Sequence, residues 1–112
     1  MREVTEAKTG KELYQSVLEK LEDGKLKPGD ENYGHAVAHC VSSMIGIIGN
    51  YRSWLNGGFG NGEQRQEWTA GIELYLGMLG RFAAAVPDLP EIFSSERGLR
   101  DGIKSFLKKE KL

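Results

Sequence analysis

The chain has 112 residues, which fits one domain, and 39% of them are hydrophobic, which excludes a disordered tail. The formal net charge of -1 excludes a general attraction to nucleic acid or to anionic membranes. The single cysteine, Cys40, has no partner for an internal disulfide, and no apolar run typical of a signal peptide follows the first residues. We therefore expect a cytoplasmic protein with a single domain over residues 1–112, of which 1–8 are frayed.

Helical periodicity and turn residues divide the chain into four predicted helices. The first covers about 9–23, where Thr9 and Glu12 have the spacing of a capping box and Gly24 is a natural left-handed stop. Its apolar residues recur on one face: Leu13, Val17, Leu18 and Leu21.

The second and third predicted helices are long, about 31–56 and 63–86, and a glycine-rich loop joins them. Asp30 or Asn32 is expected to cap the second helix, and the two prolines of the segment VPDLPE end the third. Apolar residues alternate steps of four and three along the third helix, as in a packing seam: Trp68, Ile72, Tyr75, Leu79, Phe82 and Val86.

The fourth predicted helix, about 95–109, opens at Ser94 or Ser95 and has an apolar inner face of Leu99, Ile103, Phe106 and Leu107. No alternating strand pattern occurs in the sequence. We therefore predict an all-α domain with a four-helix arrangement. A long central antiparallel helix hairpin (about 31–56 and 63–86) is flanked by two shorter helices (about 9–23 and 95–109).

The two middle helices are poor in charge, since Arg52 is the only charged residue between Asn32 and Gly62. Small residues recur at every fourth position of the second helix: Gly34, Ala38, Ser42 and Gly46. Such a row lets another helix come close, so we expect close helix packing or an oligomer contact there. A homodimer would cover the charge-poor surface, and the alternative is a monomer in which the outer helices wrap the pair completely. The polar residues within 33–51 favour a buried helix over a membrane span.

The loop between Trp54 and Trp68 lacks the lysine and hydroxyl that a Walker-type phosphate cradle needs after its last glycine. Helix lengths favour another role, because middle helices of about 36 Å and outer helices of about 21 Å leave about 15 Å uncovered at the loop end. We expect this end to be a flexible partner-binding tip formed by Tyr51, Trp54, Phe59, Arg65 and Trp68. The structural alternative is that Trp54 and Trp68 pack on each other and merely close the bundle.

His35 and His39 are four residues apart, with Glu31 one turn before them and Cys40 adjacent. A metal site needs a third or fourth ligand, and no second histidine pair or cysteine supplies one, so no stoichiometric metal and no cofactor are expected. The histidines then fill a polar pocket or line an interface. No acid is placed to orient His39 toward a nucleophile, so we assign no catalytic residue and do not expect an enzyme.

The last predicted helix carries a basic row on one flank: Arg97, Arg100, Lys104, Lys108 and Lys111. The row suits an acidic partner or a phosphate backbone, or else a solvated helix end that complements the helix dipole. Aromatic residues for base stacking are missing from it, so nucleic acid is not expected as the partner.

These patterns favour a small non-enzymatic protein–protein interaction protein, with an accessory, adaptor or inhibitory role of the kind that phage and mobile-element proteins also have. Two alternatives stay open. One is a helical domain that binds a small molecule in a pocket near His35 and His39, and the other is a metal-binding protein.

Overall fold

The computed structural model describes residues 10–87, 89–93 and 97–112, and of residues 97–99 only the backbone. This part of the chain contains four α-helices, α2 (Gly10–Glu22), α3 (Tyr33–Asn56), α4 (Gly62–Ala85) and α5 (Arg97–Glu110), and one 3₁₀ helix, η1 (Leu89–Phe93). The described residues form no strand, and the predicted all-α class is confirmed. The expected caps at Thr9, Ser94 and Ser95 lie outside the described residues.

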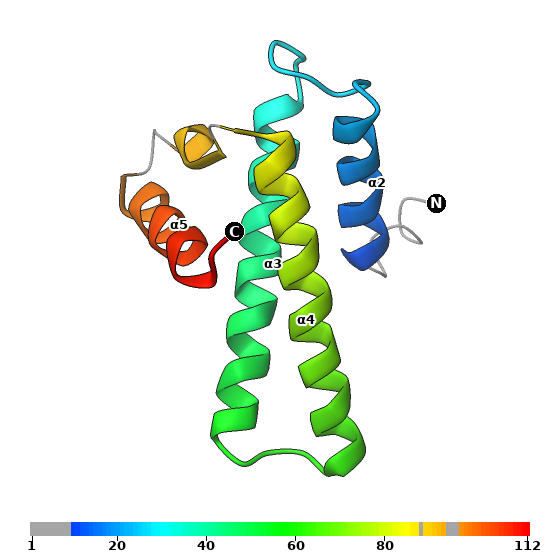
Figure 1. The fold of residues 1–112 in the computed structure, drawn as a ribbon, viewed down its shortest axis with the longest axis vertical. Coiled ribbons are helices and arrows are strands. Elements are labelled where there is room, and N and C mark those ends of the chain that lie inside the picture. Colours follow the sequence, from blue (N-terminus) through cyan, green and yellow to red (C-terminus); the bar gives the residue numbers. More distant parts are fainter. Residues whose placement is uncertain (1–9, 88, 94–96) are drawn as a thin grey trace.

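Helices α3 and α4 run side by side and are joined by the short loop 57–61 (Figure 1). In Figure 1, α2 and α5 lie beside the half of this pair that is remote from the loop, and the loop end extends past them. Each long helix has 24 residues, or about 36 Å, while α2 and α5 have 13 and 14 residues, or about 20 Å. The molecule is accordingly elongated, with a radius of gyration of 14.8 Å, against about 13 Å for a compact domain of this length.

The buried core lies in the half of the hairpin that α2, η1 and α5 cover. Every fourth or third residue of α3 contributes to it, together with the last two turns of α4: Val37, Cys40, Val41, Met44, Ile48, Met78, Leu79 and Phe82. The flanking helices add Leu18, Phe93, Ile103 and Leu107. No residue from 49 to 77 belongs to this core, although the structure describes all of them. The loop half of the hairpin therefore has no buried core of its own.

Two bidentate ion pairs attach the outer helices to the hairpin. The guanidinium of Arg52 on α3 donates to both carboxylate oxygens of Glu110 at the end of α5, at 2.9 and 3.1 Å. The guanidinium of Arg81 on α4 donates to Glu22 at the end of α2, at 2.6 and 3.0 Å. Each arginine holds the pKa of its partner carboxyl below the ordinary value.

The helix ends differ from the sequence prediction in three places. Asn32 occupies the N-cap position of α3, but its side chain makes no capping hydrogen bond, and the Asp30 carboxylate instead accepts from the Lys27 N–H at 3.0 Å. Helix α4 begins at a complete capping box formed by Asn61 and Gln64, which the prediction did not include. The segment after α4, expected as a plain linker, forms η1, whose Leu89 and Phe93 are buried.

The two glycines of the small row of α3 have no close neighbour within the chain. A Cβ atom added at Gly34 or Gly46 would meet no atom of a neighbouring element within 4 Å, and the Ser42 hydroxyl donates to Ala38 O of its own helix. Ala38, by contrast, is half-buried against the core, and the close packing or oligomer contact predicted for the row stays a prediction. The outward side of α3 carries no charge over 34–51, yet no helix in the described residues has the length and apolar composition needed to cross a membrane.

Candidate partner-binding site at the hairpin tip

The loop 57–61 has a defined conformation that depends on its glycines. Gly58 and Gly60 have φ angles of 78° and 83°, in the left-handed region that favours glycine. The N–H groups of Gly57 and Phe59 donate to Ser53 O at 2.9 Å and Trp54 O at 3.0 Å, so the loop closes the last turn of α3. The loose loop that its composition suggests is thus tied to the helix end.

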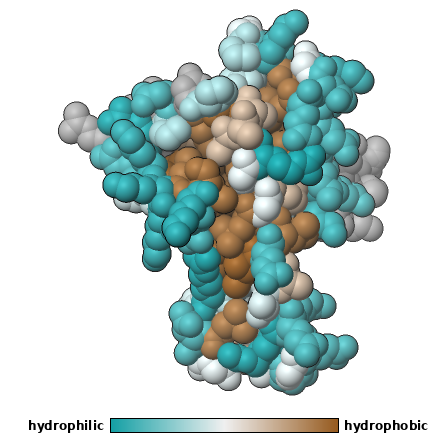
Figure 2. Space-filling view, in the orientation of Figure 1, coloured by the Kyte–Doolittle hydropathy of each residue, from teal (hydrophilic) through white to brown (hydrophobic). Residues whose placement is uncertain are grey.

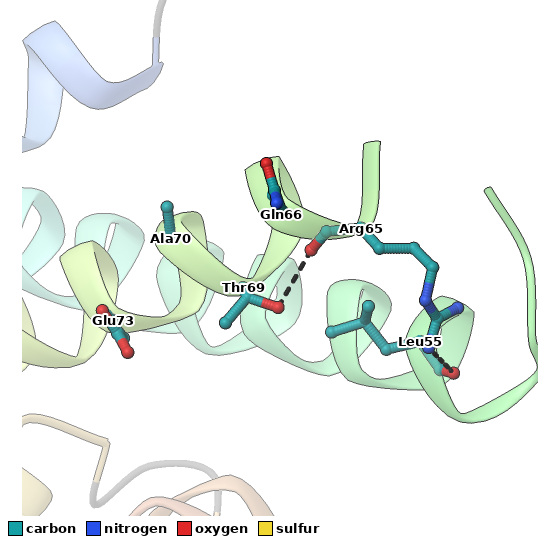
Figure 3. Close-up of a pocket in the computed structure, with 6 residues that line it drawn as sticks. All are labelled: Leu55, Arg65, Gln66, Thr69, Ala70 and Glu73. Atoms are coloured by element: carbon teal, nitrogen blue, oxygen red, sulfur yellow. Dashed lines mark hydrogen bonds between the residues drawn. The ribbon is translucent and has the colours of Figure 1, made fainter. Parts of the chain in front are cut away.

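Arg65 holds the loop from the other side. Its guanidinium reaches from the first turn of α4 to the end of α3, where it donates to Leu55 O at 3.0 Å (Figure 3) and to Phe59 O at 2.8 Å. A cation at this position complements the negative end of the α3 dipole. Arg65 is one of the predicted partner-binding residues, whereas in the structure its hydrogen bonds are directed inward and position the tip.

The capping box fixes the direction in which α4 leaves the loop. The Asn61 side chain accepts from the Gln64 N–H at 2.8 Å, and the Gln64 side chain accepts from the Asn61 N–H at 3.0 Å. Two N–H groups that would otherwise lack partners are satisfied in this way. The backbone between the two long helices is therefore hydrogen-bonded along most of its length.

The aromatic residues of the tip form one connected cluster. The Trp54 and Trp68 rings lie 5.2 Å apart between centroids at 51°, and Tyr51 lies 5.8 Å from Trp54 at 54°. These are the tilted arrangements that aromatic pairs prefer. Trp54 is 40% exposed and Phe59 62% exposed, while Tyr51 and Trp68 are half-buried. The two tryptophans do pack on each other, and the cluster still presents two large rings to solvent.

Three of these rings rest directly on glycine backbone. A Cβ atom at Gly60 would lie 2.7 Å from the Trp68 ring, and one at Gly57 would lie 2.7 Å from the Phe59 ring. On α4, a Cβ atom at Gly71 would lie 2.7 Å from the Tyr51 ring. A side chain at any of these positions would have to displace an aromatic ring.

Trp54, Phe59 and Trp68 line an open hollow of about 340 Å³. Figure 2 shows hydrophobic surface along the middle of the hairpin and a smaller hydrophobic area at the loop end, among hydrophilic residues. A second hollow, of about 370 Å³, is lined by Leu55, Arg65, Gln66, Thr69, Ala70 and Glu73 (Figure 3). Most of its lining residues are polar, and the Thr69 hydroxyl donates to Arg65 O within α4 at 2.9 Å. The hollow between the three aromatic rings is the better apolar anchor site.

Charge at the tip is unbalanced toward the acidic side. Glu63 and Glu67 are exposed on the first turns of α4, and within the described residues neither has an ion-pair partner. The two cations of this half of the hairpin are engaged, Arg65 with backbone carbonyls and Arg52 with Glu110. Backbone carbonyls are neutral, so Arg65 keeps its positive charge, and the tip carries this guanidinium together with the two exposed carboxylates.

A third hollow, of about 270 Å³, lies between α2 and α3 and is lined by Leu13, Val17, His35, Ala36, His39 and Cys40. Both imidazoles are exposed, while burial raises the pKa of the Cys40 thiol to about 11 and keeps it protonated at neutral pH. Among the described residues, Glu31 included, no group of three or more His, Cys, Asp and Glu side chains is arranged to hold a metal ion.

The basic row of α5 is exposed at Lys104, Lys108 and Lys111. Arg100 instead lies 3.8 Å from Glu91 and 3.6 Å from Asp101, and the side chain of Arg97 is outside the described residues. Of the described residues, the row thus retains three exposed lysines, two in α5 and Lys111 just beyond its end.

Comparisons of this chain with protein-family models, with curated proteins and with solved structures find no match.

Proposed function

We propose that this chain is a small protein–protein interaction protein that binds its partner through the hairpin tip and has no chemistry of its own. The observation that carries the proposal is the aromatic cluster of Trp54, Phe59 and Trp68, which stays exposed on a half-hairpin without a buried core. Exposed clusters of large aromatic side chains are typical of interfaces, where tryptophan dominates the binding energy.

The rigidity of the tip supports this role. Rings that already rest on glycine backbone, above a hydrogen-bonded loop, lose little freedom when a partner covers them. An adaptor, accessory or inhibitory protein fits such a surface, and the cytoplasmic location expected from the single cysteine is part of the same proposal.

The test is site-specific photo-crosslinking in the cell of origin. A photoreactive phenylalanine analogue at position 59 should give a defined protein adduct, and the same analogue at the exposed Ala84, on the far part of α4, should not. Excess unlabelled protein should compete for the adduct, whereas the Phe59→Ala protein should compete poorly. Phe59→Ala should leave the free energy of unfolding within about 0.5 kcal/mol, because 62% of this side chain is already in solvent. Adducts formed in equal yield from positions 59 and 84 would show that the tip is not the binding surface.

A homodimer is the second part of the proposal. The uncharged outward side of α3, with Gly46 and Gly49 exposed, is the face available for close packing against a second copy. This contact lies along the middle of α3 and does not include the loop 57–61, so dimer formation and binding at the tip are compatible.

A second candidate function is the binding of a small apolar molecule with an acidic or hydrogen-bonding group. The hollow between α2 and α3 favours it, because its walls are apolar and the imidazoles of His35 and His39 stand at its edge. The proton NMR signals of the two imidazoles should shift when such a metabolite is added and binds. Replacement of both histidines by glutamine should abolish the rise in melting temperature that the metabolite produces, while the helical circular dichroism stays unchanged.

A further inference from the structure

Helix α5 carries a basic hollow on its exposed side, beside the half of the hairpin that is remote from the loop 57–61 (Figure 1). The hollow has a volume of about 320 Å³ and is lined by Asp101, Lys104, Ser105 and Lys108. Both lysines are exposed, as is Lys111 just beyond the helix, and among the described residues none forms an ion pair with any of the three. We propose that this face of α5 binds an acidic segment of a partner protein, whose carboxylates contact Lys104 and Lys108. The face is separate from the aromatic tip and gives the protein a second binding surface.

The carboxylates of α5 do not neutralise its lysines. Glu110 is bound by Arg52 of α3, whose guanidinium donates to both carboxylate oxygens at 2.9 and 3.1 Å. Asp101 lines the hollow, but Arg100 lies 3.6 Å from it and offsets its charge. Over residues 100–111 the sequence has five cationic side chains and two carboxylates, whereas the whole chain has a net charge of -1. The basic character is therefore local to α5, and an acidic segment is its complementary occupant.

The buried side of α5 fixes the direction of the lysines. Ile103 and Leu107 belong to the core, and the helix packs on η1. Lys104 and Lys108 are one turn apart, so they lie on the same flank, about 6 Å from each other along the axis. Alternate residues of an extended chain are about 6.6 Å apart. An extended segment with acidic residues at alternate positions therefore matches the spacing of the two lysines.

Lys111 occupies a backbone conformation that favours glycine. Its φ angle is 61°, its N–H donates to Lys108 O at 3.2 Å, and the N–H of Leu112 donates to Leu107 O at 2.9 Å. This is the hydrogen-bond pattern of a Schellman motif, in which the left-handed residue is usually glycine. A lysine here keeps an ammonium group at the end of the basic helix at a cost in backbone energy, and such costs are characteristic of binding sites.

The extent of the basic face favours a protein segment over nucleic acid. The distance from Lys104 to Lys111 is about 10 Å of helix, which covers about three phosphates of one DNA strand, against about 6–10 phosphate contacts for a strongly bound protein. Asp101 in the hollow and the neighbouring Glu91, whose side chain is 57% exposed, would also repel a continuous phosphate backbone.

The test is a titration followed in the backbone amide NMR spectrum of the isotope-labelled protein. The probes are an acetylated hexapeptide in which glutamate alternates with glycine, the same peptide with glutamine in place of glutamate, and a thymidine oligonucleotide. The glutamate peptide should shift the amide signals of Lys104, Ser105 and Lys108 saturably and leave the indole signals of Trp54 and Trp68 in place. The glutamine peptide should shift none of them.

Three variants separate the contributions. Lys104→Gln with Lys108→Gln should weaken the glutamate peptide about 2- to 30-fold, since two exposed ion pairs are lost, and added salt should act in the same direction. Lys20→Gln with Lys25→Gln is the matched control, because it removes the same charge from exposed positions outside α5 and should leave the affinity nearly unchanged. Lys111→Gly should weaken the peptide about 1.4- to 5-fold, while its urea unfolding midpoint is at least that of the parent protein, because glycine suits the left-handed φ angle.

Equal shifts with the glutamate and glutamine peptides, no saturable shift, or an equal loss of affinity in the Lys20→Gln with Lys25→Gln control would overturn the inference. Tighter binding of the oligonucleotide than of the glutamate peptide would also overturn it, since the face would then recognise a phosphate backbone. Shifts of the same amides with protein concentration that disappear in Glu63→Gln with Glu67→Gln would assign the face to the acidic tip of a second copy and overturn it as well. The crosslink from position 59 tests the tip alone, so the two binding surfaces fail independently.

Discussion

Substitution of Gly60 by alanine tests whether the tip is built as a rigid platform. At this position the φ angle of 83° and the Trp68 ring both oppose a side chain, since the new Cβ would lie 2.7 Å from Cη2 and Cζ3 of the indole. Gly58 is the matched control, because its φ angle of 78° is nearly the same but no atom lies within 4 Å of the added Cβ. Both changes carry a backbone cost of about 1 kcal/mol, and only Gly60→Ala must also displace a ring.

The displacement should add about 1–3 kcal/mol, the usual cost of an overpacked contact. Urea unfolding followed by circular dichroism should therefore rank Gly60→Ala well below Gly58→Ala in free energy of unfolding. Tryptophan emission should move to longer wavelength in Gly60→Ala alone, because Trp68 is pushed into water. In a Trp68→Leu background the two glycine substitutions should cost nearly the same. Equal losses in the original background, with unchanged emission, would refute the contact.

Three further predictions concern the rest of the fold. Gly46→Leu should cost the isolated chain no stability, since helix propensity improves and no atom of the same chain is displaced. Its bulk should disrupt packing against a second copy, so light scattering should fall from about twice the 12.4 kDa chain mass to the monomer value, and the stabilisation that dimer formation adds should be lost. A monomeric parent protein would contradict the homodimer. Cys40 should react with a thiol reagent at pH 8 roughly 100-fold more slowly than the unfolded chain, because its pKa is about 11 and it is 1% exposed; rapid labelling would show that the core opens there. Arg52 lowers the pKa of Glu110, so the stabilisation from this pair should be present above the ordinary carboxyl pKa and lost as the pH falls through the lowered value. In thermal unfolding at pH 7, the free energy of unfolding of Glu110→Gln should therefore differ from that of the parent protein by less than about 1 kcal/mol. A difference that grows toward acidic pH would contradict the assignment.

The helices of this chain could be predicted from local signals. Gly24 and Pro87 each lie just beyond a helix end, and the four-and-three spacing along α4 identified Leu79 and Phe82 as core residues. Such signals act within a few residues, so a single sequence contains them. The start of α4 could also be predicted from the sequence, because Asn61 and Gln64 have the spacing of a capping box.

The choice of close helix contact could not be predicted from one helix alone. The row through Gly34 and Gly46 has the right spacing, but small residues also occur where nothing covers a helix. Which side faces α4 depends on the rotation of both helices about their axes. The large residues of α3 set that rotation, and the close approach then falls at Gly71, where Tyr51 crosses to α4.

The candidate site was located by a length argument and not by a motif. Helix lengths point to the aromatic residues of the tip but give no information about Arg65, whose hydrogen bonds run to the carbonyl groups of Leu55 and Phe59. Backbone acceptors leave no trace in a sequence, so a side chain that binds them resembles any other exposed cation. For the same reason the sequence suggests that Gly57 and Gly60 are flexible positions, whereas in the structure an aromatic ring packs on each of them.

The absence of core residues between 49 and 77 also affects how this protein can evolve. A substitution at Phe59 or Trp54 changes what the tip recognises while most of the folding free energy resides elsewhere in the chain. Random mutation can therefore sample new specificities at Phe59 without first acquiring compensating stabilising changes. The glycines beneath the rings have no such freedom, and the same reasoning predicts that variation among descendants of this sequence would concentrate on the rings and spare Gly57, Gly60 and Gly71.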